Sequence, residues 1–281
     1  MKLLRHSDLN DSDLGEVLDR RHIISPVYTA QVEQAADYPK FREWAISTKS
    51  TELLVEGSFG PFESHHISAL SVLCATLTQT LCVRENYISL VFFCGSHVED
   101  DDDNDSDADS DADVTLAAGG VLMIKSLIAQ LLEQRSDFEL TGLDRQIDKR
   151  LVEESDLDEL CILFRWLVER LPEGLTVVCI IDGVVHYEID SLVDELTKVL
   201  ECLLDLVRNE DMRSPVKVLV TSPTPTESVR GLFDSDKEEE SFYLLLDSIG
   251  QATYLPDEVS FGYLDADSTS DDSDVDYHST T

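Results

Sequence analysis

Three apolar segments of the sequence end in residues that could bind a phosphate group and a metal ion. The first, LLVEG, runs into the glycine-containing stretch Gly57–Ser64 (GSFGPFES), the second ends at Asp182, and the third ends at Thr221–Pro223. Backbone N–H groups of a glycine-rich loop can surround a phosphate, and an acid that follows a buried strand can hold Mg²⁺. Gly57, Ser64 and Asp182 are therefore the candidate cofactor-binding residues.

The elements that position these residues alternate between short apolar runs and amphipathic helical patterns. Apolar runs of strand length occupy residues 53–57, 87–95, 176–182, 216–223 and 242–246. Helical periodicity covers residues 68–82 and 119–134, a segment that opens at Ser155 with a capping-box-like spacing to Asp158, and a segment that starts at Ser191. Strands that are apolar on both faces and separated by helices indicate a mostly parallel sheet, which predicts a three-layer α/β/α sandwich. In such a sheet ligands bind at the carboxyl ends of the strands, where all three candidate segments fall.

Five segments in this order, LLVEG, ISLVFFCGSH, SLIAQLL, CIIDG and VKVLVTSP, resemble the NACHT-like, STAND-class P-loop NTPase domains, especially the fungal ones. The resemblance covers roughly residues 50–250. It implies that Gly57–Ser64 corresponds to the Walker A loop, Asp182 to the Walker B acid and residues 216–223 to a sensor strand. It also implies that a functional member would use Mg-ATP or Mg-GTP as its cofactor.

The Walker A pattern G-x-x-x-x-G-K-[ST], laid over Gly57–Ser64, matches only at its first and last positions. Phe62 stands at the second glycine and Glu63 stands at the lysine. The lysine of this motif neutralises phosphate charge, and the glycine lets the backbone close around the phosphate. A glutamate about 4 Å from a phosphate replaces attraction with repulsion, a difference of at least ~2 kcal/mol. We therefore expect that this loop does not bind phosphate in the usual way.

The other positions that contact nucleotide in the family are altered as well. Val185 stands where a second acid is expected after Asp182, with Glu188 as the nearest displaced candidate, and Pro223 stands where relatives often carry an arginine. Strand motifs that persist without these contacts predict a degenerate, pseudo-NTPase site with no catalytic residue and no cofactor. A strand-terminal acid that caps the following turn is the favoured role for Asp182, and a metal ligand is the alternative.

Other polar groups in the sequence have weaker claims to chemistry. His65 and His66 are adjacent and have no third ligand at a useful spacing, which predicts exposed turn residues. His186 and Glu188 could form an acid–base pair, but no nucleophile motif accompanies them. Residues 103–107 imitate the start of an EF-hand loop, yet the glycine and the glutamate of that motif are absent. We expect no metal site, and we expect the six cysteines to be reduced and buried.

The protein has 281 residues with 58 acidic and 21 basic side chains, which gives a formal net charge of −37. Two acidic runs without a base, residues 99–113 and 265–281, hold ten and six of these acids. This charge disfavours nucleic acids and anionic membranes as partners, because both are themselves negative. No apolar stretch is long enough to span a membrane and no secretory signal is visible, so the expected location is cytoplasmic, with the nucleus as the alternative.

The expected domains are an N-terminal helical extension (1–48), a P-loop NTPase-like α/β domain (49–255) with a disordered acidic insertion (99–115), and a disordered acidic tail (256–281). The expected function is that of a non-catalytic protein-interaction or regulatory module whose protein partner the sequence does not identify. One alternative is a weak nucleotide-binding NTPase with a non-standard phosphate loop. The other is an acidic protein that binds basic proteins through its acidic segments.

Overall fold

The computed structural model describes residues 7–59, 66–98, 119–135, 138, 142–234 and 242–246. Its strands are β1 (Thr51–Glu56), β2 (Tyr87–Phe93), β3 (Thr176–Asp182), β4 (Val216–Ser222) and β5 (Tyr243–Leu245). Its α-helices are α1 (Ser7–Asp19), α2 (Pro26–Asp37), α3 (Pro39–Ile46), α4 (Ala69–Cys82), α5 (Gly120–Gln134), α6 (Lys149–Glu153), α7 (Leu157–Val168), α8 (Val193–Arg208) and α9 (Ser228–Phe233). Short 3₁₀ helices are η2 (Arg20–Ile23), η3 (Cys94–His97), η4 (Leu143–Arg145) and η5 (Val184–Tyr187).

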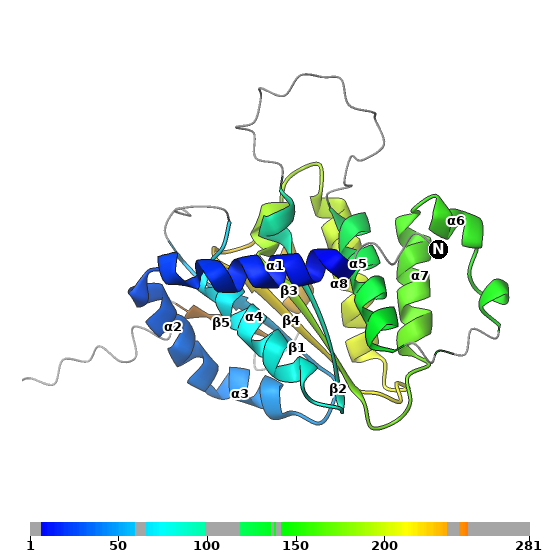
Figure 1. The fold of residues 1–281 in the computed structure, drawn as a ribbon, viewed down its shortest axis with the longest axis horizontal. Helices are drawn as coiled ribbons and strands as arrows, with labels where there is room; N and C mark the ends of the chain where they lie inside the picture. The colour runs from blue at the N-terminus through cyan, green and yellow to red at the C-terminus, as the bar shows by residue number, and fades with distance from the viewer. Residues whose placement is uncertain are drawn as a thin grey trace, which may run out of the picture.

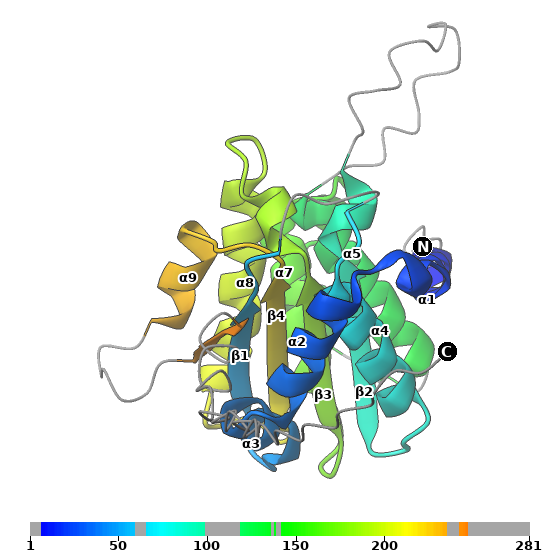
Figure 2. The ribbon, with the colours of Figure 1, turned by 90° about the vertical axis from the view of Figure 1, so that its left-hand side faces the viewer.

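The strands pair in parallel in the order β2-β3-β4-β1-β5, with β1, β4, β3 and β2 side by side from left to right in Figure 2. β1 therefore lies between β4 and β5. The register places Val55 beside Thr221 and Phe93 beside Asp182, so the strand ends fall at nearly the same level. The expectation of a mostly parallel sheet is confirmed. The fold thus gathers three segments that are far apart in the sequence at one edge.

Helices cover both faces of the sheet, which confirms the three-layer sandwich (Figures 1 and 2). One face packs against α1 to α4, and the other packs against α5, α7, α8 and α9. The hydrophobic stripe of α8, which includes Leu196, Val199 and Leu203, is fully buried on this second face. Because both faces of each central strand are covered, these strands consist of nearly continuous apolar residues.

Reciprocal hydrogen bonds attach the N-terminal helices to the sheet at its amino edge. The ammonium of Lys217, a buried residue of β4, donates to the main-chain oxygens of Trp44 (2.9 Å) and Ala45 (2.8 Å) at the end of α3. In return, the indole N–H of Trp44 donates to the main-chain oxygen of Val218 (3.1 Å). A buried lysine thus satisfies carbonyl groups that the end of a helix leaves without partners.

Side-chain amides occupy the outer edge of β2. Gln130 of α5 accepts from the Val91 N–H (2.9 Å) and donates to the Val91 main-chain oxygen (2.8 Å). One turn later, Gln134 makes the same pair of bonds with the N–H (3.1 Å) and the oxygen (2.7 Å) of Ser89. Side chains four residues apart lie on the same face of a helix, and residues two apart point to the same side of a strand. The spacing of the two glutamines on α5 therefore fits the spacing of Ser89 and Val91 on β2.

The predicted helix starts need small corrections. Asp156, rather than Ser155, is the N-cap of α7, and its carboxylate accepts from the Glu159 N–H at 2.9 Å. The backbone of Ser155 is left-handed (φ 66°), and its hydroxyl accepts from Lys125 instead. A carboxylate is the stronger acceptor at the positive end of a helix, so the aspartate takes the cap. The helix predicted from Ser191 begins at Val193.

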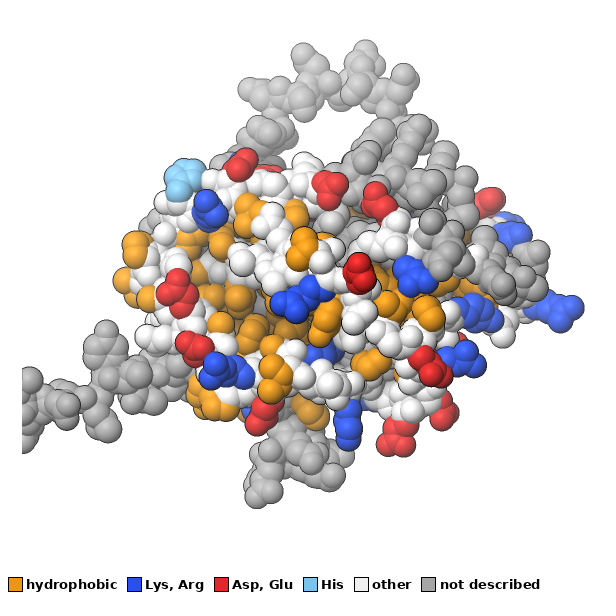
Figure 3. Space-filling view, turned by 60° about the horizontal axis from the view of Figure 1, so that its bottom comes forward, with side chains coloured by type: hydrophobic (Ala, Val, Ile, Leu, Met, Phe, Trp, Pro, Cys, Tyr) orange, Lys and Arg blue, Asp and Glu red, His pale blue; other side chains and the backbone are white. Residues whose placement is uncertain are grey.

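Charged side chains are mixed on the face of the molecule shown in Figure 3. Basic and acidic groups of the described residues alternate there, with hydrophobic side chains between them. No described helix is long and apolar enough to cross a membrane. The predicted acidic insertion and tail lie outside the described residues.

Candidate functional site

The predicted strand ends lie together where the strands of the sheet end, at their carboxyl termini. This side of the sheet is called its carboxyl edge. Glu56 ends β1, Asp182 ends β3 and Ser222 ends β4, and all three side chains are buried. Gly57 follows β1 directly, as expected for a phosphate-binding loop. Ser64 and the substituted positions Phe62 and Glu63 lie outside the described residues, so their cofactor-binding roles remain predictions.

The first residues after β1 are bound to the end of β4 rather than arranged around an open space. The Gly57 N–H donates to the Ser222 main-chain oxygen (2.8 Å), and the Phe59 N–H donates to the Pro223 oxygen (3.0 Å). A Cβ at Gly57 would stand only 2.9 Å from the Pro223 oxygen, so this position needs glycine. Two N–H groups that a phosphate would use are therefore already bonded within the protein.

Phe59 fills the space beside this loop. Its side chain is 7% exposed, and its ring lies 4.7 Å from the ring of Tyr28 in α2, measured between centroids. The same ring also lies against Gly57. Phe62, which stands at the second glycine of the Walker A pattern, lies outside the described residues, and the aromatic residue that the structure describes at this loop is Phe59.

The helix after the loop begins late and is capped by its own side chains. α4 starts at Ala69, five positions beyond Ser64, whereas a Walker A loop leads directly into its helix. The Ser68 hydroxyl accepts from the Ser71 N–H (3.2 Å), and the Ser71 hydroxyl accepts from the Ser68 N–H (3.0 Å). This reciprocal capping box takes up N–H groups that would otherwise attract an anion.

Asp182 is 2% exposed and is surrounded by neutral hydrogen-bond donors. The Thr221 hydroxyl donates to its Oδ1 at 2.5 Å, and hydrogen bonding from the side chains of Ser71 and Cys74 also favours the charged form of the carboxylate. Burial raises the pKa of Asp182 to about 6, although these hydrogen bonds act in the opposite direction. Within the described part of the chain, the carboxylate is thus held by hydroxyl and thiol groups and not by a cation.

Glu56 is a second buried acid at this edge, and the sequence analysis missed it. It is 1% exposed and accepts from the N–H (2.8 Å) and the hydroxyl (2.7 Å) of Thr226. Its other oxygen accepts from two nitrogens of Arg230 in α9, one of them at 2.9 Å. A charged residue at the end of an apolar strand needs a buried partner, and this was the signal that could have identified it.

Glu188, the displaced candidate for a second acid, binds a helix instead. Its two carboxylate oxygens accept from the N–H groups of Glu227 (3.1 Å) and Val229 (2.8 Å) at the start of α9. These bonds take both oxygens of Glu188 away from an acid–base pair with His186. The geometry therefore does not support the hypothesis of an acid–base pair between Glu188 and His186.

His66 and His186 lie against each other, which corrects the prediction of an exposed turn for His66. Their ring centroids are 4.7 Å apart in an edge-to-face arrangement, and both side chains are half-buried. Gly95 fits beside them because a Cβ there would stand 2.6 Å from the His66 main-chain oxygen. Burial, with a further contribution from His66, lowers the pKa of His186 to about 4, so this ring is neutral at pH 7. His65 lies outside the described residues.

The six cysteines are free thiols, as the sequence predicts. Five of them are buried, namely Cys74, Cys94, Cys161, Cys179 and Cys202. Cys82 is exposed, contrary to the prediction, because it ends α4 on the solvent side. Among the described residues no group of three or more His, Cys, Asp or Glu side chains could hold a metal ion.

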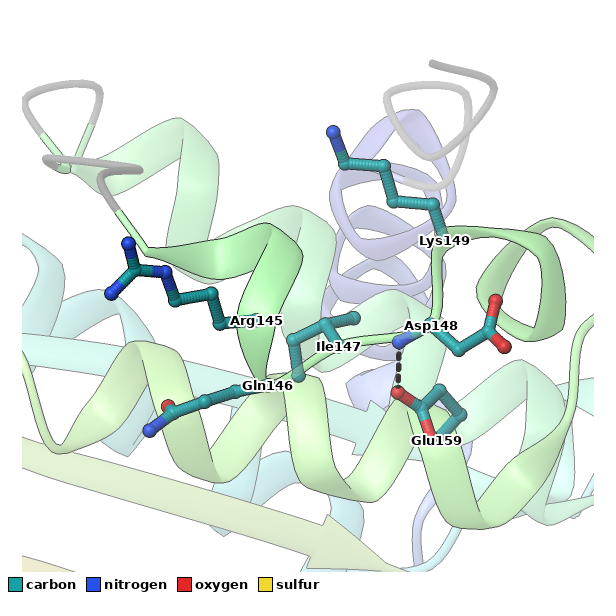
Figure 4. Close-up of a pocket in the computed structure, with 6 residues that line it drawn as sticks. All are labelled: Arg145, Gln146, Ile147, Asp148, Lys149 and Glu159. Carbon is teal, nitrogen blue, oxygen red and sulfur yellow. Dashed lines mark hydrogen bonds between the residues drawn. The ribbon is translucent and has the colours of Figure 1, made fainter.

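A cavity of about 660 Å³ lies elsewhere, on the outer side of α7 (Figure 4). Its lining includes Arg145 and Lys149, which extend away from Glu159 in the figure. Glu159 accepts from the Asp148 N–H at 2.5 Å, which closes the base of the cavity. None of the predicted site residues lines it, so we assign it no part in the candidate site.

The family model described as Nephrocystin 3, N-terminal, matches residues 32–223, about two thirds of the chain. No curated protein sequence matches it. Among solved structures, a chain in the structure of Drosophila ORC bound to GC-rich DNA and Cdc6 is 14% identical with a TM-score of 0.36, and the match covers 86% of this chain and 32% of that chain. The present chain thus spans about a third of that chain's length, and a likeness at this level carries no functional argument.

Proposed function

The chain belongs to the family described as Nephrocystin 3, N-terminal, and is a P-loop NTPase-like domain; from this premise we propose that it is a pseudo-NTPase that acts through contacts with other proteins. In this proposal the nucleotide site at the carboxyl edge is replaced by internal hydrogen bonds. Gly57, Ser64 and Asp182 are vestiges of Walker A and Walker B positions. No residue of the chain has a catalytic role.

The observation that carries the proposal is that the described N–H groups and buried carboxylates at this edge are already hydrogen-bonded within the protein. The N–H groups of Gly57, Phe59 and Ser71 donate within the protein. The two buried acids, Glu56 and Asp182, accept from neighbouring side chains and main-chain groups. A nucleotide with Mg²⁺ would have to displace these bonds and bring further negative charge beside a buried carboxylate, which is costly in a medium of low dielectric constant.

The substituted loop supports the same conclusion from sequence. Glu63 stands at the position of the phosphate-binding lysine, and Phe62 stands at a glycine position. Without the lysine the loop lacks the charge that holds the β- and γ-phosphates. A non-enzymatic domain of this class retains surfaces for protein partners, which is the role that we propose here.

The test is a calorimetric titration of the full chain with Mg-ATP and with Mg-GTP, accompanied by thermal unfolding in the presence of each. We expect no heat of binding and no shift of the unfolding midpoint at millimolar nucleotide. An active P-loop protein serves as the positive control. Saturable binding that Asp182→Ala abolishes would overturn the proposal and establish the weak nucleotide-binding alternative.

A restored loop provides a sharper version of this test. In the double variant Phe62→Gly with Glu63→Lys, the Walker A pattern is complete in the register assigned to Gly57–Ser64. The single variant Glu63→Gln is the matched control, because it removes the negative charge without supplying a lysine. Millimolar or tighter binding by the double variant alone supports the assigned register, whereas binding by neither variant contradicts that register.

A further inference from the structure

Three pairs of residues join α7 to α8 along one seam of the helical layer that covers the second face of the sheet. The two helices run in the same direction, so the residue numbers of both partners rise together along the seam. The outer pairs are ion pairs with N–O distances of 2.9 and 3.0 Å. In order, the pairs are Asp158–Lys198, Cys161–Cys202 and Arg165–Asp205.

The central pair consists of two cysteines, one on each helix. The Cys202 thiol donates to the main-chain oxygen of Cys161 at 3.6 Å, which places its sulfur against the backbone of Cys161. Cys161 is 8% exposed and Cys202 is 6% exposed, so both lie just below the surface. The ion pairs on either side join the same two helices. The Cys202 sulfur therefore lies beside Cys161, and both residues are close to the surface.

The surroundings of the pair favour one of the two thiols as the nucleophile. A hydrogen bond with Cys161 and the nearby guanidinium of Arg165 lower the pKa of Cys202, despite its burial and the charge of Asp205. The hydrogen bond with Cys202, followed by burial, raises the pKa of Cys161. Since the thiolate is the reactive form, Cys202 is the thiol that reacts first with an oxidant.

We propose that Cys161 and Cys202 form a redox-sensitive pair that hydrogen peroxide converts into a disulfide between α7 and α8. In the first step the Cys202 thiolate attacks one peroxide oxygen, the O–O bond breaks, and a proton completes the departing water, which leaves Cys202 as a sulfenic acid. In the second step the Cys161 sulfur attacks the Cys202 sulfur and the S–O bond breaks. The departing hydroxide takes the proton of Cys161 and leaves as water. Two thiols are thus oxidised while one peroxide is reduced to two waters.

The other cysteines are placed less favourably. Cys179 lies near Cys202 on β3 but is completely buried, and burial raises the pKa of its thiol. Cys82 is exposed but lies on α4, in the layer on the opposite face of the sheet. We therefore expect Cys161 and Cys202 to pair with each other rather than with Cys179 or Cys82. This pairing goes beyond the proposed function because it does not depend on nucleotide.

The test is peptide mapping of the full chain after mild peroxide treatment and alkylation of the remaining thiols. Tryptic cleavage places Cys161, Cys179 and Cys202 in three separate peptides, 151–165, 171–198 and 199–208. We expect a linked pair of the first and the last, with a mass loss of two hydrogen atoms that a reductant reverses. The Cys82→Ser variant is the background for this experiment, because it removes the exposed thiol that could link two molecules.

Matched variants separate this pair from non-specific oxidation. Cys161→Ser should leave Cys202 as a sulfenic acid that a cyclic 1,3-diketone traps, whereas Cys179→Ser should leave the cross-link unchanged. Arg165→Gln should slow cross-linking several-fold, and unfolding in urea should abolish its selectivity. Alkylation of Cys202 as a free thiol after treatment, or a link from Cys202 to Cys179, would overturn the proposal. Because the wild-type map alone gives a decisive result, poor folding of any variant does not prevent the test.

Discussion

Two buried acids, Glu56 and Asp182, lie at the same edge of the sheet in opposite electrostatic settings. Glu56 faces the guanidinium of Arg230, so its negative charge is matched by a positive one. Asp182 faces hydroxyl and thiol donors, and burial raises its pKa to about 6. Removing one partner of a buried ion pair is costly, whereas a buried charge that has no counter-charge already opposes folding. The two acids are therefore expected to respond in opposite directions when their charges are altered.

The largest expected effect comes from removing the cation of the matched pair. Arg230→Met leaves the Glu56 carboxylate buried without its counter-charge, and it should lower the free energy of unfolding by about 3 kcal/mol, as is typical when one partner of a buried pair is lost. Urea unfolding measures the change. The double variant Glu56→Gln with Arg230→Met is the matched control and should recover most of the loss. If Arg230→Met unfolds at the wild-type urea concentration, the two acids do not differ as described.

The unmatched acid should respond in the opposite direction. Asp182→Asn removes a carboxylate whose charge is not compensated, and at pH 7.5 it should raise the free energy of unfolding by ~1–3 kcal/mol, since a pKa raised from 3.8 to about 6 corresponds to at most ~3 kcal/mol. Chemical denaturation at pH 7.5 measures the gain. A loss of stability in this variant would show that the charged form of Asp182 is favoured, for example by a bound cation. Addition of Mg²⁺ to the wild type would then raise its unfolding midpoint.

The pH dependence of the same variant gives an independent readout. Because the folded pKa of Asp182 lies above its unfolded value, the folded state holds the proton more tightly between these two values. The contribution of this residue to stability therefore falls as the pH rises from about 4 to about 6, and it stays constant above that. In Asp182→Asn this fall should be absent. An unchanged pH profile would contradict the raised pKa.

The smallest expected effect comes from a single neutral donor. Thr221→Val keeps the shape of the side chain but removes the hydroxyl that donates to Asp182, and it should cost ~1 kcal/mol at pH 7.5. It should also move the pH-dependent fall to a higher pH, since a hydrogen bond to the charged form has been lost. In the Asp182→Asn background the same substitution should cost less. Equal costs in the two backgrounds would show that Thr221 does not stabilise the carboxylate.

The sequence predicted the layers of this fold well for a simple physical reason. Strands that are covered on both faces consist of nearly continuous apolar residues, so residues 176–182 and 216–223 can be recognised without knowledge of their neighbours. The helix over 68–82 was equally clear, and it is found at Ala69–Cys82. Asp182 could be placed at a strand end because an acid interrupts an apolar run there.

The remaining features depend on contacts between distant segments. Glu56 was missed because its partner Arg230 is 174 positions away, and nothing near β1 indicates an ion pair. The predicted N-cap of α7 was wrong by one residue, because Ser155 and Asp156 can both accept from the first N–H groups of the helix. Lys125 of another helix binds the Ser155 hydroxyl, and Asp156 takes the cap. His66 was predicted to be exposed because its neighbour in space, His186, is distant in sequence. Local patterns therefore predict elements, while the partners of buried polar groups require the fold.

The two glutamines along β2 have a consequence for how the protein can associate. An unpaired sheet edge is a template on which a strand from another molecule can add, and repeated addition builds cross-β fibrils. Gln130 and Gln134 take four hydrogen bonds of this edge, at Val91 and Ser89, that an incoming strand would otherwise make. Within the described part of the chain, strand addition is therefore open only beside β5. The glutamines thus make the outer edge of β2 a poor template for association with another molecule.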